Sequence, residues 1–99
     1  MKTFNDLKVG DHVYYVSAML NVYKNKIIKT KKTKGFIWIT LNCGRYEIKD
    51  NSYDRIACAG TIFSDKEMAI KSLKNQIRKY QELIDNGLSN IKELENENI

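Results

Sequence analysis

The spacing of apolar residues along the chain changes near residue 64. Before that point, apolar and polar residues alternate in short runs, as they do in strands with one buried face. After it, Ile70, Leu73, Ile77, Tyr80 and Ile84 recur at steps of three and four, as they do along one side of a helix. The pattern therefore predicts an α+β protein, with a β-rich unit over residues 1–63 and a long amphipathic helix over residues 64–99.

The β-rich part divides into five predicted strands. In the strongest of them, residues 35–41, Ile37, Ile39 and Leu41 share one face, while Phe36 and Trp38 lie on the other. Five short strands separated by turn residues are typical of a small antiparallel barrel or a strongly bent sheet. The predicted strands are 11–16, 22–30, 35–41, 45–49 and 55–63, with a kink in the last at Gly60.

The helical part opens with a predicted capping box formed by Ser64 and Glu67. Isoleucines then occupy position a of a heptad, and the same register continues to Leu94. Gly87 falls inside this register and allows two structures. One is a continuous helix from about residue 65 to 95 with a weak point at the glycine, and the other is a helix that ends there. The unbroken register favours the continuous helix.

Two segments resemble parts of known protein types. "LKVGDHVYYV" (residues 7–16) resembles the opening of small SH3-like or KOW-like barrels, in which a VGD turn leads into the first strand. "TIFSDKEMAIKSL" (residues 61–73) resembles the end of many short bacterial and phage proteins. The resemblance implies a small antiparallel SH3-like β-barrel with a C-terminal helix, of bacterial or phage type. Because such barrels bind many kinds of ligand, it assigns no functional residue.

Charge is unevenly distributed along the chain. The net charge is +5, and residues 1–63 hold 11 Lys and Arg against 5 Asp and Glu, whereas residues 64–99 hold 6 against 7. An apolar content of 42% is enough to form a core. The start of the chain has no continuous apolar segment of the signal-peptide kind, and Cys43 and Cys58 are the only cysteines. These features predict a cytoplasmic protein with free thiols and no membrane association.

The sequence offers little catalytic chemistry. His12 is the single histidine, and two cysteines 15 residues apart do not match the spacings of zinc ligands. The chain contains neither a GxGxxG dinucleotide motif nor a GK[ST] phosphate loop. We therefore expect a non-enzymatic binding module without cofactor or metal, of otherwise unknown function.

A lysine-rich segment beside aromatic residues suggests the first kind of partner. Lysines are attracted to phosphates without regard to base sequence, and exposed aromatic rings can stack on bases. Nucleic acid is thus the first predicted partner. The predicted nucleic-acid-binding residues are Lys24, Lys26, Lys29, Lys31, Lys32, Lys34, Trp38, Arg45 and Arg55, with Lys31, Lys32 and Lys34 placed in a hairpin turn. In the alternative, the lysines are simply solvated and the helix covers Phe36 and Trp38, and the sequence favours this covering.

The helix suggests a second kind of partner. Its apolar stripe is longer than a barrel of this size, so its far end should contact another helix. The predicted interface consists of Tyr80, Ile84, Ile91 and Leu94. Through it the protein would form a homo-oligomer with a coiled-coil contact. It could instead act as a protein-interaction module, such as a phage-encoded inhibitor or adaptor that binds a host protein.

Overall fold

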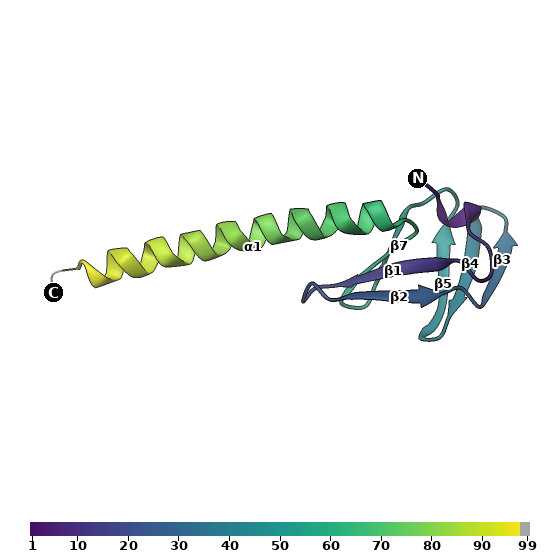
Figure 1. Ribbon diagram of the computed structural model, residues 1–99, viewed down its shortest axis with the longest axis horizontal. Coiled ribbons are helices and arrows are strands. Elements are labelled where there is room, and N and C mark those ends of the chain that lie inside the picture. Colours follow the sequence, from purple (N-terminus) through teal and green to yellow (C-terminus); the bar gives the residue numbers. More distant parts are fainter. Residues whose placement is uncertain (98–99) are drawn as a thin grey trace.

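A computed structural model describes residues 1–97 of the protein. Seven antiparallel strands and a short 3-10 helix form a β unit, and one long helix extends from it (Figure 1). The predicted α+β class and the order of β-rich part and helix are confirmed. The elements are η1 (Phe4–Asp6), β1 (His12–Ser17), β2 (Val22–Lys26), β3 (Lys29–Thr33), β4 (Phe36–Leu41), β5 (Gly44–Lys49), β6 (Asp54–Ala57), β7 (Gly60–Phe63) and α1 (Lys66–Glu95).

The strands form two separate sheets. The first, sheet A, has the order β2-β1-β7-β6, and the second, sheet B, has the order β3-β4-β5. The sheets are not closed into the predicted barrel, because within residues 1–97 no backbone ladder joins β5 to β6 or β2 to β3. Instead the two sheets pack face to face, and each contributes one side of a shared core.

Two predicted strands are each divided in the structure. The chain leaves sheet A at Ile27, whose amide donates to the Asp11 carbonyl at 2.8 Å, and enters sheet B at Ile28, whose amide donates to the Thr40 carbonyl at 2.9 Å. The predicted strand 22–30 therefore becomes β2 and β3. Residues 55–63 likewise form the hairpin of β6 and β7, with Cys58 in the turn at a positive φ of 52°.

The core lies between the sheets. Ile37, Ile39 and Leu41 of β4 are buried as their alternation predicts, and Val13 and Ile62 of sheet A face them across the core. Gly60 allows β7 to approach β1 closely, because a Cβ at this position would collide with the Val16 carbonyl oxygen and the Tyr15 ring.

The N-terminus closes one end of this core. Phe4, on η1, is fully buried, and its amide donates to the Ser52 carbonyl at 3.0 Å. The hydroxyl of Ser64 donates to the Lys2 carbonyl at 2.6 Å and fastens the N-terminus to the end of β7. The predicted capping box is therefore wrong. Ser64 is used in this tertiary contact, and Asp65 takes the N-cap position without a side-chain hydrogen bond to the helix.

The first turns of α1 cover the outer face of sheet A. Met68, Ala69 and Leu73 pack with Val16 and Phe63 in a second, smaller apolar cluster. The predicted covering of Phe36 and Trp38 by the helix is wrong, because the face that the helix covers belongs to β1 and β7 rather than to β4. The outer face of sheet B is left open, and Phe36 keeps 40% of its surface exposed.

Helix α1 runs unbroken from Lys66 to Glu95, so the continuous alternative at Gly87 is correct. The helix extends well beyond the β unit, and the molecule measures 65 × 24 × 23 Å (Figure 1). In residues 1–97, no helix combines the length and apolar character needed to cross a membrane.

Replacing Gly87 with alanine should strengthen the middle of the helix. A Cβ at this position meets no atom within 4 Å, so alanine introduces no clash. Alanine favours an α-helix over glycine by about 1 kcal/mol per residue. We expect Gly87→Ala to increase the helical circular-dichroism signal at 222 nm. An unchanged or weaker signal would contradict the uninterrupted helix, and Ser89→Ala, nearby on the polar side, serves as a control of smaller expected gain.

Candidate nucleic-acid interface

The outer face of sheet B carries a group of cationic and aromatic side chains. Residues directly opposite each other in neighbouring antiparallel strands point to the same face. Lys31 lies opposite Trp38, and Lys29 opposite Thr40, which in turn lies opposite Arg45. Alternation along three strands therefore brings residues from 29 to 45 together on one surface.

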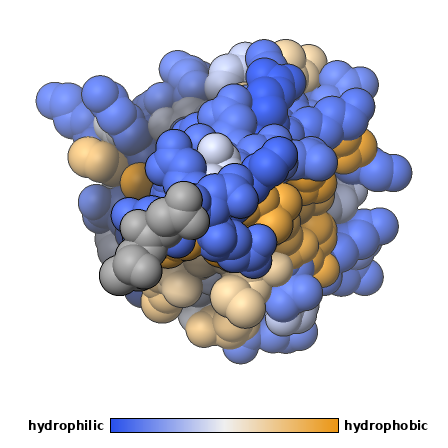
Figure 2. Space-filling view, turned by 90° about the vertical axis from the view of Figure 1, so that its left-hand side faces the viewer, coloured by the Kyte–Doolittle hydropathy of each residue, from blue (hydrophilic) through white to orange (hydrophobic). Residues whose placement is uncertain are grey.

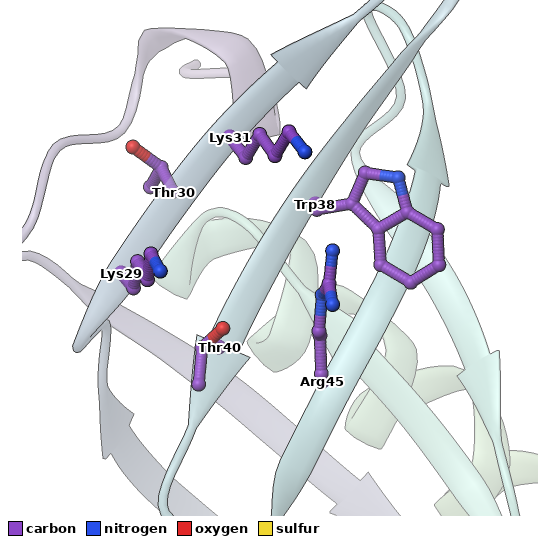
Figure 3. A pocket seen from close by; sticks show the side chains of 6 residues that line it. All are labelled: Lys29, Thr30, Lys31, Trp38, Thr40 and Arg45. Atoms are coloured by element: carbon purple, nitrogen blue, oxygen red, sulfur yellow. The ribbon is translucent and has the colours of Figure 1, made fainter.

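These residues line an open pocket of about 370 Å³. Trp38 and Thr40 lie on the central strand β4, the lysines come from β3, and Arg45 comes from β5 (Figure 3). Figure 3 shows Lys31 and Arg45 reaching toward the indole ring from the two flanking strands. The lining residues are Lys29, Thr30, Lys31, Trp38, Thr40 and Arg45.

Arg45 stacks on Trp38. Its guanidinium carbon lies 4.3 Å from the ring centroid, the geometry of a cation–π interaction. The contact holds the long arginine side chain over the ring, so less conformational entropy is lost when either group meets a ligand. Together the indole and guanidinium form a flat, positively charged surface that is suited to stacking on a base and pairing with a phosphate.

The charge on this face is positive but not uniform. Lys49 on β5 lies opposite Phe36 and adds another cation to this face. Glu47, also on β5, lies directly opposite Trp38 and is the acidic residue of the face. Four cations against one carboxylate leave a positive potential over the pocket. The Glu47 carboxylate would repel an anion on the β5 side of Trp38, so the lysine side is the more favourable side for an anionic group.

Several of the predicted residues lie outside this pocket. Lys24 and Lys26 belong to β2 of sheet A and lie opposite Tyr14 and His12. Tyr14 packs in the cluster beneath α1, so these two lysines point to the helix side of sheet A. Their strand sits in the other sheet, and the structure does not bring them to the Trp38 pocket.

Lys31 and Lys32 are on strand β3 rather than in a turn, which corrects their predicted placement. Lys32 lies opposite Ile37 and so points to the inner side of sheet B at its edge, away from Trp38. Lys34 alone of the three lies in the β3–β4 turn, beside Gly35. Of the lysines predicted for this site, Lys29 and Lys31 line the pocket.

Arg55 has a different environment from Arg45. It lies on β6, where its Nε donates to the Glu47 carbonyl at 3.1 Å, its Nη1 donates to the Ile56 carbonyl, and its guanidinium sits 5.8 Å from the Tyr46 centroid. The contacts with Glu47 and Tyr46, both on β5, join sheet A to sheet B. Arg55 is thus held in a structural contact and does not reach the pocket.

Sequence reasoning missed Thr30, Thr40 and Lys49 as members of this region. The alternation in β4 already placed Thr40 on the same face as Trp38, and the alternation in β5 placed Lys49 with Arg45. Finding them required knowing that β3, β4 and β5 are adjacent and in which register they pair.

A second pocket, of about 290 Å³, lies at one end of the β unit and includes the two cysteines. Cys43 and Cys58 are free and exposed. The Cys43 thiol lies 3.6 Å from the Tyr46 hydroxyl, and this hydrogen bond, followed by burial and nearby thiol charge, raises the pKa of Tyr46. Within residues 1–97, no three His, Cys, Asp or Glu side chains gather closely enough to hold a metal ion.

Comparison with known protein families, curated proteins and solved structures finds no match to this chain. The resemblance of residues 7–16 to SH3-like or KOW-like barrels therefore stays a prediction. Two surfaces of residues 1–97 are candidates for binding a partner: the outer face of sheet B and the exposed length of α1.

Proposed function

We propose that the protein is a non-enzymatic module that binds single-stranded nucleic acid on the outer face of sheet B. The observation that carries this proposal is the pocket around Trp38, which is lined by three cations and covered by no other part of residues 1–97. Trp38 is half-buried beneath the Arg45 guanidinium and lies on the face of β4 opposite the core, so it has no evident role in the core.

The mechanism combines stacking with charge neutralisation. A base would stack against the Trp38–Arg45 surface, and the adjacent phosphates would contact Lys29 and Lys31. Stacking of a base on an aromatic side chain contributes about 1–3 kcal/mol and tolerates any base. The phosphate contacts release counterions, so affinity should fall steeply as salt rises. Binding of this kind depends little on base sequence, and a duplex, whose bases are already stacked, should bind less tightly.

The first test is a fluorescence polarisation titration of labelled single-stranded and double-stranded oligonucleotides at two salt concentrations. We expect Trp38→Ala to weaken single-strand binding by roughly 5- to 100-fold, because it removes the stacking surface. Double-strand binding, which depends on charge, should change less. Phe36→Ala removes a neighbouring exposed ring outside the pocket and serves as the matched control. If the wild-type protein fails to bind single strands at low salt, the proposal is refuted.

A second candidate function is favoured by the exposed apolar stripe on α1. Ile84, Ile91 and Leu94 each keep more than half of their surface exposed. Ile84 lines a shallow pocket with Leu20 of the β1–β2 turn, and Ile91 and Leu94 lie further along the helix. Tyr80, the remaining residue of the predicted interface, donates from its hydroxyl to the Ala18 carbonyl at 2.9 Å and so contacts the chain's own β1–β2 turn. We propose that the helix beyond Tyr80 is a protein-interaction surface, used for self-association or for binding a host protein.

A further inference from the structure

The last three turns of α1 extend beyond every other element of the protein, whereas Gln81, Ile84 and Asp85 still line a shallow pocket with Leu20 of the β1–β2 turn (Figure 1). The hydrogen bond from Tyr80 to Ala18 is the last one that joins the helix to the β unit among the described residues. The following segment, residues 81–95, spans about 22 Å at 1.5 Å per residue. It carries five large apolar side chains, each 52–66% exposed. They are Leu83, Ile84, Leu88, Ile91 and Leu94.

A helical segment of this length gains only marginal stability in water from its own backbone. Helices shorter than about 12–15 residues are marginal even in alanine-rich peptides, and most helical stability in proteins comes from packing of an apolar face. Figure 2, viewed from the C-terminal end, shows apolar surface gathered to one side of a largely polar surface. The segment is therefore built to pack against another apolar surface of similar length.

The distribution of charge along α1 indicates the direction in which a partner helix would run. Residues 66–79 carry five basic side chains and one acidic one, whereas residues 82–97 carry five acidic and one basic. If α1 of a second copy ran parallel to this helix, the two acidic halves would lie side by side, where like charges repel. In an antiparallel copy, the acidic end of each helix, with Glu93, Glu95 and Glu97, would instead lie beside Lys74, Arg78 and Lys79 of the other helix.

We infer that α1 pairs antiparallel with α1 of a second copy of the chain. This inference rests on the second candidate function and names its partner. Pairing each a position with a d position of the partner gives a register that buries the exposed apolar stripe. Ile77 faces the partner's Leu94 and Ile84 faces the partner's Gly87, while Lys74 flanks the partner's Glu95.

Gly87 fits this register. Nothing in the chain itself lies within 4 Å of a Cβ built at this position, so no intramolecular contact requires glycine. In the pair, the space beside Gly87 receives the partner's Ile84, a large side chain against a small one. The symmetric contact repeats on the other side of the two-fold axis, as an isologous interface requires.

Light scattering coupled to size exclusion tests the pairing on the full chain at several concentrations. We expect a dimer that dissociates on dilution. Ile84→Gln with Ile91→Gln should shift the midpoint of dissociation to at least roughly 100-fold higher concentration, because two apolar contacts per helix are lost. Asn86→Gln with Ser89→Gln, on the polar side of the same turns, should leave it unchanged. A wild-type monomer at all concentrations would overturn the inference.

Cysteine cross-linking tests the orientation. In a Cys43→Ser, Cys58→Ser background, an equal mixture of Ile77→Cys and Leu94→Cys proteins should form mainly the mixed disulfide when oxidised with glutathione disulfide. Leu94→Cys alone should cross-link poorly. Predominant linkage between two Leu94→Cys chains would overturn the antiparallel arrangement yet leave self-association standing. Oligonucleotide titrations of the same proteins report separately on the Trp38 pocket, so failure of either proposal is seen independently.

Discussion

Replacing Lys29 and Lys31 together with glutamate will weaken binding of a single-stranded oligonucleotide by roughly 10- to 100-fold at low salt. Both lysines line the Trp38 pocket, and their reversal removes the two proposed phosphate contacts and introduces two repulsive charges. For single strands, the slope of log affinity against log salt falls by about 0.7 for each lost contact, so it should decrease by about 1.4. Polarisation titrations at several salt concentrations measure both quantities.

Lys24 and Lys26 provide a matched control for this experiment. Replacing both with glutamate changes the net charge by the same amount, but they point to the helix side of sheet A. We expect the control to lose a few-fold in affinity through the weaker overall field, with the salt slope nearly unchanged. Equal losses in the two double variants would show that total charge, rather than the pocket, determines binding, and would contradict the proposed site.

Replacing Phe4 with alanine will have the largest effect on stability. Phe4 is fully buried between the sheets, and truncating a buried phenylalanine costs about 3–5 kcal/mol. Because small domains have unfolding free energies of only about 5–15 kcal/mol, this loss should leave the β unit close to unfolding at room temperature. Urea titration followed by the fluorescence of Trp38 measures the change.

Phe36→Ala makes the same chemical change at an exposed position. Phe36 keeps 40% of its surface in contact with solvent and packs outside the core cluster, so we expect a loss below about 1.5 kcal/mol. If the two variants lost equal stability, η1 would not be part of the folded core, and the N-terminus would not close the end of the β unit as described.

Local patterns in the sequence predicted the elements well. The alternation of Ile37, Ile39 and Leu41 correctly identified the buried face of β4, and the heptad register correctly carried the helix through Gly87. These features depend on neighbours a few residues apart, which the sequence displays directly. The same alternation placed Trp38 on the opposite face, and this was enough to propose it as a ligand-binding residue.

Features that depend on which elements become neighbours could not be predicted. The covering of Phe36 by the helix was wrong because an apolar stripe does not indicate which of two sheets it will cover. Ser64 has the composition of a helix cap, yet its hydroxyl bonds to the Lys2 carbonyl, 62 residues away. Likewise, Lys29 and Lys24 are five residues apart in the sequence but lie in different sheets, because the chain crosses between sheets at Ile27 and Ile28.

The open side between β5 and β6 has a mechanical consequence. A closed ladder of backbone hydrogen bonds would fix the curvature of sheet B, but here the guanidinium of Arg55 spans the gap to the Glu47 carbonyl. A single side chain with several rotatable bonds yields more readily than a ladder of backbone hydrogen bonds. We therefore expect sheet B to flatten or bend by small amounts while its own three strands stay paired, a compliance that would suit the proposed single-stranded ligand.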